Sequence, residues 1–516
     1  MIAALLACQA QEFARIQTLE LDAGQRADVV TLADLDGDGV REVVLALHEP
    51  GKRFARRLET WRPGEGGGAG GALTRSESLA LTPDVVAFAH ADVRAGGGEE
   101  LLLFNSGGVF EWRSGPEARP ERLLACEFLW QTPDPELVFE WQGGVRDVDG
   151  DGLADLILPE PGGFLIARQR RPRGSDAPWG DVSRVRVPPG PAAGVWARAE
   201  RGQGGVESRR DNGSFSVGIR ISDGDDEGHG GPLVSVVEQV PAPFWLDWDA
   251  DLDLDLLLQT ERHLHVWIQE QAGFSSAPQH SLVLPVAADT SRELDASYSA
   301  HAVDLDLDRR ADCVIFAGDK RSDDVRTQGL FFTQARAAEG PPLFGQEGRP
   351  ASLLVFAGFV SDPRFRDLDG DGYPELVLQT VRPDLIDELR SASTETIDAD
   401  LFVYRNRRGV LARQPDVARR HPIALEGLEL GAEFLGDVTG DGLADLLVRD
   451  EPEKLRLLML RSQGSGEKST WSLPEKPVWE LSVAKDARVV LVPPTKSERP
   501  ALFVLEPSQV LWVRFR

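Results

Sequence analysis

A short acidic phrase recurs along this chain and is the clearest sign of its chemistry. At residues 34–42 it reads DLDGDGVRE, with carboxylates at the first, third, fifth and ninth positions. Hard divalent cations prefer several oxygen ligands, and alternate carboxylates on a tight loop supply them. The phrase therefore predicts a Ca²⁺-binding loop. Close copies occupy residues 147–155 and 367–375, and looser copies occupy 247–255, 304–312 and 437–445.

Each loop must be held by the chain on either side of it, and these flanks are strand-like. Val29–Ala33 enters the first loop, and the apolar run Val43–Leu47 leaves it. Such runs, rich in Val and Leu and separated by Gly and Pro, favour strands that are buried on both faces. A decayed copy at Asp92–Glu100 keeps only the ends of the phrase, and a loop at Pro493–Ala501 has almost no carboxylates.

The spacing of these loops predicts the fold. Their first residues stand at 34, 92, 147, 247, 304, 367 and 437. A period of roughly 60 residues with several short strands is typical of a four-stranded propeller blade. We interpret the longer interval after residue 147 as one blade that carries an insertion at about 189–232.

With the C-terminal unit, this spacing predicts one all-β propeller over residues 11–516, with eight four-stranded blades, seven being the alternative. The last unit offers only three strands, and an open sheet edge is unfavourable. We therefore expect the orphan strand at Ala14–Leu21 to complete the final blade and close the ring.

The loops, with the apolar strands that follow them, resemble the FG-GAP/VCBS repeat family, which includes the integrin α-chain propeller. Residues 366–378 match the family pattern closely, and residues 250–257 share its alternation of Asp with other residues. The resemblance covers nearly the whole chain, from about residue 14 to residue 516. It implies a propeller with Ca²⁺ loops, whereas it leaves the ligand open, because such repeats occur in adhesins, lectins, receptors and polysaccharide lyases.

In that family the side chains at loop positions 1, 3, 5 and 9 bind Ca²⁺ together with the carbonyl at position 7. The resemblance therefore implies up to six Ca²⁺ sites, with these side-chain ligands: Asp34, Asp36, Asp38 and Glu42; Asp147, Asp149, Asp151 and Asp155; Asp247, Asp249, Asp251 and Asp255; Asp304, Asp306, Asp308 and Asp312; Asp367, Asp369, Asp371 and Glu375; Asp437, Thr439, Asp441 and Asp445.

Position 6 of the loop should be Gly, because the turn there needs a positive φ. Leu252 and Arg309 depart from this rule, so we expect distorted sites in those two copies. Thr439 replaces one carboxylate by a hydroxyl. An EF-hand is a poor alternative, because it needs Glu at position 12 and flanking helices. The other loops comply at position 6, with Gly39, Gly152, Gly372 and Gly442.

Composition excludes some classes of partner. The chain has 516 residues, of which 41% are hydrophobic, and a formal net charge of −28. This acidity argues against nucleic acid and anionic membranes as partners, and bound cations would offset part of it. No stretch of the sequence approaches the length of a membrane span.

The N-terminus indicates export. Residues 1–10 resemble a truncated signal peptide, and the sequence LLAC that ends at Cys8 resembles a bacterial lipobox, in which Cys8 would carry a lipid anchor. Cleavage after Ala10 by an ordinary signal peptidase is the rival interpretation, and an accidental apolar start is a third. Because extracellular Ca²⁺ is abundant, such loops suit an exported protein, in the periplasm, at the outer surface or secreted. We expect Cys126 and Cys313 to be buried free thiols.

Other residues that could do chemistry have simpler interpretations. His263 and His265 share a strand face, but no third ligand is near them in sequence, so a solvated face is favoured over a metal site. The sequence contains no nucleophile elbow and no Cys–His signature. Trp179, Trp196 and Trp248 could contact a ligand, although packing or loop anchoring is favoured.

The sequence thus predicts an exported Ca²⁺-binding β-propeller that acts as a binding or scaffold module for a protein or glycan. The alternative is a polysaccharide-active enzyme, such as a lyase built on the same propeller. No catalytic residue can be named for that alternative.

Overall fold

The computed structural model of the chain describes most of its residues. They are 13–52, 54–63, 73–94, 97–105, 107–112, 120–126, 136–160, 162–170, 178–188, 195–201, 216–221, 232–241, 243–249, 251, 253–260, 263–271, 273–283, 297–310, 312–319, 326–335, 343–344, 350–381, 396–424, 432–464, 469–492 and 500–515. The N-terminal segment with Cys8 and the loop residue Leu252 lie outside these ranges.

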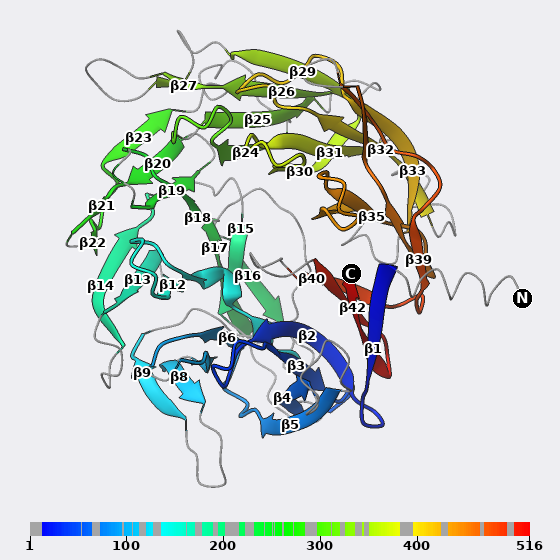
Figure 1. The fold of residues 1–516 in the computed structure, drawn as a ribbon. Coiled ribbons are helices and arrows are strands. Elements are labelled where there is room, and N and C mark those ends of the chain that lie inside the picture. The colour runs from blue at the N-terminus through cyan, green and yellow to red at the C-terminus, as the bar shows by residue number, and fades with distance from the viewer. Residues whose placement is uncertain are drawn as a thin grey trace, which may run out of the picture. The chain divides into compact units, whose positions relative to one another are not determined.

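The fold is an all-β, eight-bladed propeller, as the sequence predicts, and the described residues form eight blade sheets (Figure 1). The chain divides into two compact units. One comprises Asp28–Arg292, and the other comprises Met1–Ala27 with Glu293–Arg516. Each unit is described by itself below.

The unit at Asp28–Arg292 contains four blade sheets, in each of which successive strands pair in an antiparallel manner. In chain order the strands are β2 (Arg26–Ala33), β3 (Glu42–His48), β4 (Arg56–Pro63) and β5 (Leu73–Ala80); β6 (Ala87–Ala91), β7 (Glu100–Asn105), β8 (Gly108–Trp112) and β9 (Glu121–Leu124), with β10 (Phe139–Glu140) added parallel to β6; β11 (Val145–Arg146), β12 (Asp155–Glu160), β13 (Gly163–Gln169) and β14 (Trp179–Arg186); and β18 (Pro243–Leu246), β19 (Asp255–Gln259), β20 (His263–Trp267) and β23 (His280–Val283).

Three further strands of this unit form a sheet of their own, outside the four blade sheets. They are β15 (Val195–Arg201), β16 (Ser216–Ile221) and β17 (Pro232–Pro241), with β17 in the centre. This sheet falls in the long interval between the loops at 147 and 247. A short hairpin, β21 (Gln269–Glu270) and β22 (Gly273–Phe274), and one 3₁₀ turn, η1 (Gln142–Gly144), complete the unit's described elements.

The second unit contains the other four blade sheets. In chain order the strands are β24 (Ser297–Val303), β25 (Asp312–Asp319), β26 (Arg326–Phe332) and β29 (Ser352–Ala357); β30 (Phe359–Arg366), β31 (Glu375–Val381), β32 (Thr396–Tyr404) and β33 (Val417–Ala424); β34 (Ala432–Gly436), β35 (Asp445–Glu451), β36 (Lys454–Leu458) and β39 (Trp479–Ser482); and β40 (Arg488–Val492), β41 (Ala501–Leu505) and β42 (Gln509–Phe515), completed by β1 (Ala14–Glu20). Two short hairpins are added, β27 (Gln334–Ala335) with β28 (Leu343–Phe344) and β37 (Arg461–Gln463) with β38 (Thr470–Ser472).

The N-terminal strand completes the last blade, which confirms the expected closure. β1 pairs antiparallel with β42, from Ala14 opposite Phe515 to Glu20 opposite Gln509. Ala14 and Leu19 are each 1% exposed, whereas Ile16 is 38% exposed. Residues from the two ends of the chain are therefore held in one sheet by seven backbone pairs and by two buried side chains.

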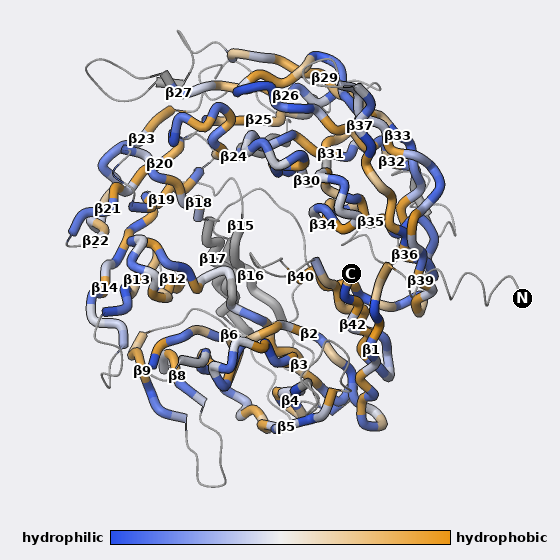
Figure 2. The backbone as a smooth tube through the Cα atoms, viewed as in Figure 1, coloured by the Kyte–Doolittle hydropathy of each residue, from blue (hydrophilic) through white to orange (hydrophobic). Residues whose placement is uncertain are grey.

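The second strand of each blade carries much of the core. Every residue of β12 is buried, and so is every residue of β19 and β41. Leu156, Ile157 and Leu158 are consecutive, yet all three belong to one apolar cluster with Leu256 and Leu258 of the next blade. Consecutive residues point to opposite faces of a strand, so β12 is buried on both faces. Figure 2 shows hydrophobic strand segments alternating with hydrophilic turns.

Both described cysteines are free thiols. Cys313 is buried as expected, whereas Cys126 is only partly buried. Burial raises the pKa of Cys313 to about 12 and that of Cys126 to about 11. Among the described residues, no helix has the length and apolar character needed to cross a membrane.

Candidate metal centres

The acidic loops join the first and second strands of their blades, and their backbones share one turn. After β2 the N–H of Gly39 donates to Asp34 at 3.0 Å, and after β30 the N–H of Gly372 donates to Asp367 at 3.0 Å. Gly39 and Gly372 have φ values of 82° and 89°. Glycine adopts this left-handed conformation without a steric cost. The carboxylate at position 1 therefore closes the turn at position 6.

The loop after β24 keeps this turn without glycine. Leu307 and Arg309 have φ values of 59° and 66°, and the N–H of Arg309 still donates to Asp304 at 2.9 Å. The left-handed conformation costs a non-glycine residue about 1–2 kcal/mol. The loop is thus strained, whereas its turn is retained.

The carboxylate at position 9 is a buried structural group. In the six loops that retain most of the phrase it is at most 2% exposed. It accepts the backbone N–H of position 2 in those loops and also in the decayed copy. The donor–acceptor pairs are Leu35 to Glu42 at 2.8 Å, Val93 to Glu100 at 2.8 Å, Val148 to Asp155 at 2.9 Å, Trp248 to Asp255 at 2.7 Å, Leu305 to Asp312 at 2.9 Å, Leu368 to Glu375 at 2.8 Å and Val438 to Asp445 at 2.9 Å.

The second oxygen of this carboxylate holds a later part of the same blade. In four loops it accepts a backbone N–H from a residue at or just beyond the end of the third strand. These donors are Gln169 to Asp155 at 2.8 Å, Gln269 to Asp255 at 2.8 Å, Gln334 to Asp312 at 2.9 Å and Asn406 to Glu375 at 3.3 Å. The position 9 carboxylate therefore links the loop to the third strand through backbone hydrogen bonds.

Burial makes the ionised form of these carboxylates unfavourable. It raises the pKa of Asp155, Asp255 and Asp312 to about 7 each, the pKa of Glu375 to about 8 and that of Asp445 to about 6. The backbone hydrogen bonds act in the opposite direction, and neighbouring loop carboxylates add to the rise. A cation in the loop would offset both the burial and the repulsion.

Five loops bring three carboxylates together closely enough to hold one ion. In each, the candidate ligand oxygens lie within 4.8 Å of one another. The groups are Asp34, Asp36 and Glu42; Asp147, Asp149 and Asp155; Asp247, Asp249 and Asp251; Asp304, Asp306 and Asp308; and Asp367, Asp369 and Asp371. Positions 1 and 3 thus take part in all five groups, whereas position 9 takes part in two.

The remaining residues that the resemblance implies as ligands stand outside these five groups. Among the described residues, the loop after β34 brings no three carboxylates together, in keeping with its hydroxyl at position 3. There, the Thr439 N–H and Oγ1 both donate to Asp445, at 2.8 and 3.4 Å. The residues outside the groups are Asp38, Asp151, Asp255, Asp312, Glu375, Asp437, Thr439, Asp441 and Asp445.

The loop after β11 fits a cation best. Oδ1 of Asp147 and Oδ1 of Asp149 are buried and have no hydrogen-bond partner in the described part of the chain. Two buried anionic oxygens without a donor are costly. A hard cation between them would satisfy both, and an all-oxygen ligand set suits Ca²⁺ better than a transition metal.

Arginines share the loop charge in at least three blades, and in the loop after β24 Arg310 Nη1 lies 3.7 Å from Asp308. Arg62 Nε lies 3.2 Å from Glu42, and its Nη2 lies 3.4 Å from Asp36. Arg168 Nη1 lies 3.7 Å from Asp149. These guanidinium groups offset part of the carboxylate repulsion before any ion binds.

Neighbouring loops are joined by amide side chains. Gln269 Nε2 donates to the Val148 carbonyl of the preceding loop at 3.4 Å. Asn406, which is 1% exposed, donates from Nδ2 to the Leu305 carbonyl at 2.7 Å and to the Pro374 carbonyl at 3.1 Å. The backbone of these same residues holds the position 9 carboxylate of their own blade. Gln269 and Asn406 each therefore connect two successive acidic loops, through backbone and side chain together.

The decayed copy after β6 supports the first loop. The N–H of Glu99 donates to the Asp34 carbonyl at 2.6 Å, and the Glu99 carboxylate accepts the Asp34 N–H at 2.8 Å. A Cβ placed on Gly98 would lie 2.7 Å from the Leu35 carbonyl oxygen, so only glycine permits this close approach. This copy has no carboxylates at positions 3 and 5, and its last residues instead contact the neighbouring loop.

His265 is only 5% exposed, so the strand face that carries the two histidines is not the solvated face that the sequence suggested. His263 and His265 stack with ring centroids 5.6 Å apart. The His265 nitrogens lie 3.3 Å from Thr260 Oγ1 and 2.9 Å from Ser281 Oγ, and burial lowers the pKa of His265 to about 4. Trp179 and Trp248 are 3% and 5% exposed. The side chain of Trp196 lies outside the described set.

No protein-family model matches the chain, and no curated protein matches it. Among solved structures, it is similar to a lectin of Agrocybe aegerita that recognises non-reducing terminal N-acetylglucosamine. The identity is 14% over 97% of this chain and 98% of that chain, with a TM-score of 0.37. It is also similar to the Photorhabdus luminescens Tc holotoxin pore, with 14% identity, coverage of 82% of this chain and 18% of that chain, and a TM-score of 0.26. Neither similarity identifies a ligand for this chain.

Proposed function

We propose that the protein is a Ca²⁺-stabilised propeller of the FG-GAP/VCBS type that works outside the cell as a binding or scaffold module for a glycan or a protein. The observation that carries the proposal is the recurrence of one loop geometry, which gathers carboxylate triads within 4.8 Å in five blades. The two unpartnered buried oxygens of Asp147 and Asp149 give the same indication independently.

The residues of each loop have distinct roles in this proposal. Position 1 closes the turn and faces the ion, position 3 adds a ligand oxygen, and position 9 fixes the loop to the blade. When bound, Ca²⁺ supplies positive charge to a cluster of carboxylates that repel one another. Because the ion binds the native state only, it stabilises that state.

Export is part of the proposal because the Ca²⁺ concentration outside the cell is high enough to fill such loops. Ca²⁺ sites of modest affinity fill at extracellular concentrations. The N-terminal sequence that ends at Cys8 supports lipidation or secretion. A scaffold cross-linked by ions at its loops would present fixed surfaces to a partner.

Calorimetric titration of the EDTA-treated chain with Ca²⁺ tests the metal part. We expect five to six ions per chain, which is one for each triad and up to one for the loop after β34. The double variant Asp147→Asn/Asp149→Asn should lose one ion. Absence of binding heat together with unchanged melting would overturn the proposal.

The binding part needs a separate assay on the Ca²⁺-loaded chain. A glycan array and a pull-down from cell-surface extracts should yield a ligand that is lost in EDTA. Incubation with uronic-acid polysaccharides, followed by the absorbance of unsaturated products, serves as the counter-test. Release of such products would show that the protein is a lyase and would overturn its assignment as a binding module.

A further inference from the structure

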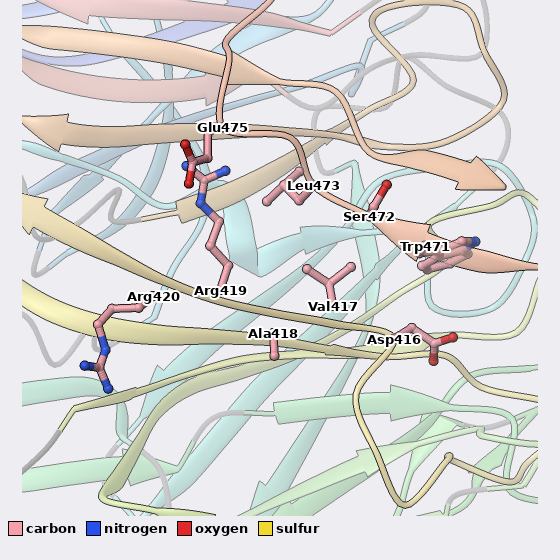
Figure 3. A pocket seen from close by; sticks show the side chains of 9 residues that line it. All are labelled: Asp416, Val417, Ala418, Arg419, Arg420, Trp471, Ser472, Leu473 and Glu475. Carbon is pink, nitrogen blue, oxygen red and sulfur yellow. The ribbon is translucent and has the colours of Figure 1, made fainter.

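A cavity of about 650 Å³ lies between the outer strand β33 and the segment that contains β38. Figure 3 shows the side chains that line it. Val417 and Arg419 come from β33, whereas Trp471 and Leu473 come from the facing segment. All of them belong to the unit that includes Glu293–Arg516, and none of the lining residues is a predicted ligand of an acidic loop.

One end of this cavity is fixed by a buried arginine. The guanidinium carbon of Arg405 lies 4.0 Å from the ring centroid of Trp471. Its Nη1 donates to Ser469 Oγ at 2.8 Å, and its Nη2 lies 3.8 Å from an oxygen of Asp416. Trp471 and Asp416 are thus held in place, with the tryptophan 5% exposed. A site whose groups are already ordered loses less entropy when a ligand binds.

The other end is polar and also partly ordered. Arg419 Nη1 donates to the Pro474 carbonyl at 3.1 Å. In Figure 3 its side chain extends from β33 toward Glu475, which is exposed. Arg420 donates to Asp400 at 2.9 Å. The polar end therefore presents donors from Arg419 and acceptors from Glu475.

The charges that line the cavity cancel. Asp416 is paired with Arg405, and Arg420 is paired with Asp400. The two remaining ionic groups, Arg419 and Glu475, have opposite signs. The lining is therefore neutral although the whole chain carries a formal charge of −28. Neither sign of charge dominates the lining, so it favours neither an anionic nor a cationic ligand.

We propose that this cavity is a subsite for a neutral saccharide. A sugar ring would present C–H groups to the half-buried Leu473, and its hydroxyls would bond to Arg419 and Glu475 at the rim. Val417 and Trp471, each 5% exposed, form the floor. The volume of the cavity lies within the range of small-ligand sites, and its lining exposes more polar than apolar surface, which suits the hydroxyls of a sugar. The inference rests on the proposed binding function and names a ligand class and a place for it.

The test uses the full Ca²⁺-loaded chain and named probes. Saturation-transfer NMR with cellotriose, maltotriose and mannotriose should detect binding of at least one, with oligogalacturonate and oligomannuronate as charged counterparts. Glu475→Gln and Arg419→Gln should each weaken the bound trisaccharide about tenfold, which is the loss of one charge-assisted hydrogen bond. Lys476→Gln changes a neighbouring exposed charge outside the lining and should leave the affinity unchanged.

Each of the other outcomes contradicts either this inference or the proposed function. Trisaccharide binding that neither lining variant weakens would place the sugar site elsewhere and overturn this inference, while the proposed function stands. Preference for the uronates would refute the argument from neutral charge. Capture of a peptide or protein without any sugar binding would overturn the inference only. If neither glycan nor protein binds the Ca²⁺-loaded chain, the proposed function fails as well.

Discussion

Removing Ca²⁺ should make the protein prefer mildly acidic pH, and adding Ca²⁺ should reverse that preference. The reason is the buried carboxylate at position 9. Burial raises the pKa of Glu375 to about 8 from 4.5, so between these values the metal-free folded state keeps a proton that the unfolded state has released. The folded state then binds more protons, and its stability falls as pH rises through this window.

The magnitude for one residue follows from linkage. Each pH unit inside the window changes the free energy of unfolding by about 1.4 kcal/mol. Between pH 5.5 and 7.5, Glu375 alone should therefore cost the metal-free protein about 2 to 3 kcal/mol. Asp155, Asp255 and Asp312, with pKa values of about 7, change stability in the same direction.

Urea unfolding at pH 5.5 and 7.5, in EDTA and in excess Ca²⁺, measures these differences. In EDTA, Glu375→Gln should reduce the pH difference by about 2 to 3 kcal/mol. The matched control is Glu453→Gln, which makes the same charge change at an exposed residue between β35 and β36. Its pH difference should equal that of the unmodified chain. A metal-free chain that is more stable at pH 7.5 than at pH 5.5 would refute the reasoning.

Three further expectations follow from particular contacts. Arg309→Gly should relieve the left-handed strain and stabilise the Ca²⁺-loaded chain by about 1 kcal/mol in thermal melts, whereas Gly152→Ala, at a φ of 81°, should destabilise it by a similar amount. Asn406→Ala should cost about 2 to 4 kcal/mol in urea unfolding and lower the ion content by up to two, because it frees two acidic loops at once; loss of stability with unchanged metal content would show that the amide supports the fold alone. Leu19→Ala should cost about 2 to 4 kcal/mol by emptying a buried position in the closing strand, while Ile16→Ala on the exposed side of that strand should cost less than about 1 kcal/mol; equal costs would argue against closure by β1.

The fold and the loops could be predicted because their signals are local. Glycine at position 6 indicates a positive φ, alternate aspartates indicate side chains that converge, and apolar runs indicate strands buried on both faces. The closing strand followed from counting strands in the last blade. The register of that pairing, with Ala14 opposite Phe515, comes from the structure.

The hydrogen-bond partners of each loop position could not be predicted, because they depend on tertiary contacts. The second partner of Glu375 is the backbone of Asn406, which belongs to the other end of a long β-hairpin. The side chain of Asn406 then reaches Leu305, in a different blade. The cavity beside Trp471 has the same origin, since Arg419 and Trp471 line it from two different blades. No spacing rule in the sequence connects such pairs.

The hydrogen bonds at position 9 also explain how a blade can keep its fold when its loop lacks carboxylates at positions 3 or 5. The copy at Asp92 has no carboxylates at positions 3 and 5, yet Glu100 still accepts the Val93 N–H at 2.8 Å. The loop at Asp437 has lost position 3 and keeps the same bond through Asp445 at 2.9 Å. Position 9 serves the fold in all of these copies through backbone donors and also belongs to two of the carboxylate triads, whereas position 3 belongs to all five triads. We therefore expect substitution at position 3 to weaken cation binding and leave the strand connection intact, while substitution at position 9 leaves two buried N–H groups without an acceptor in any loop that has both.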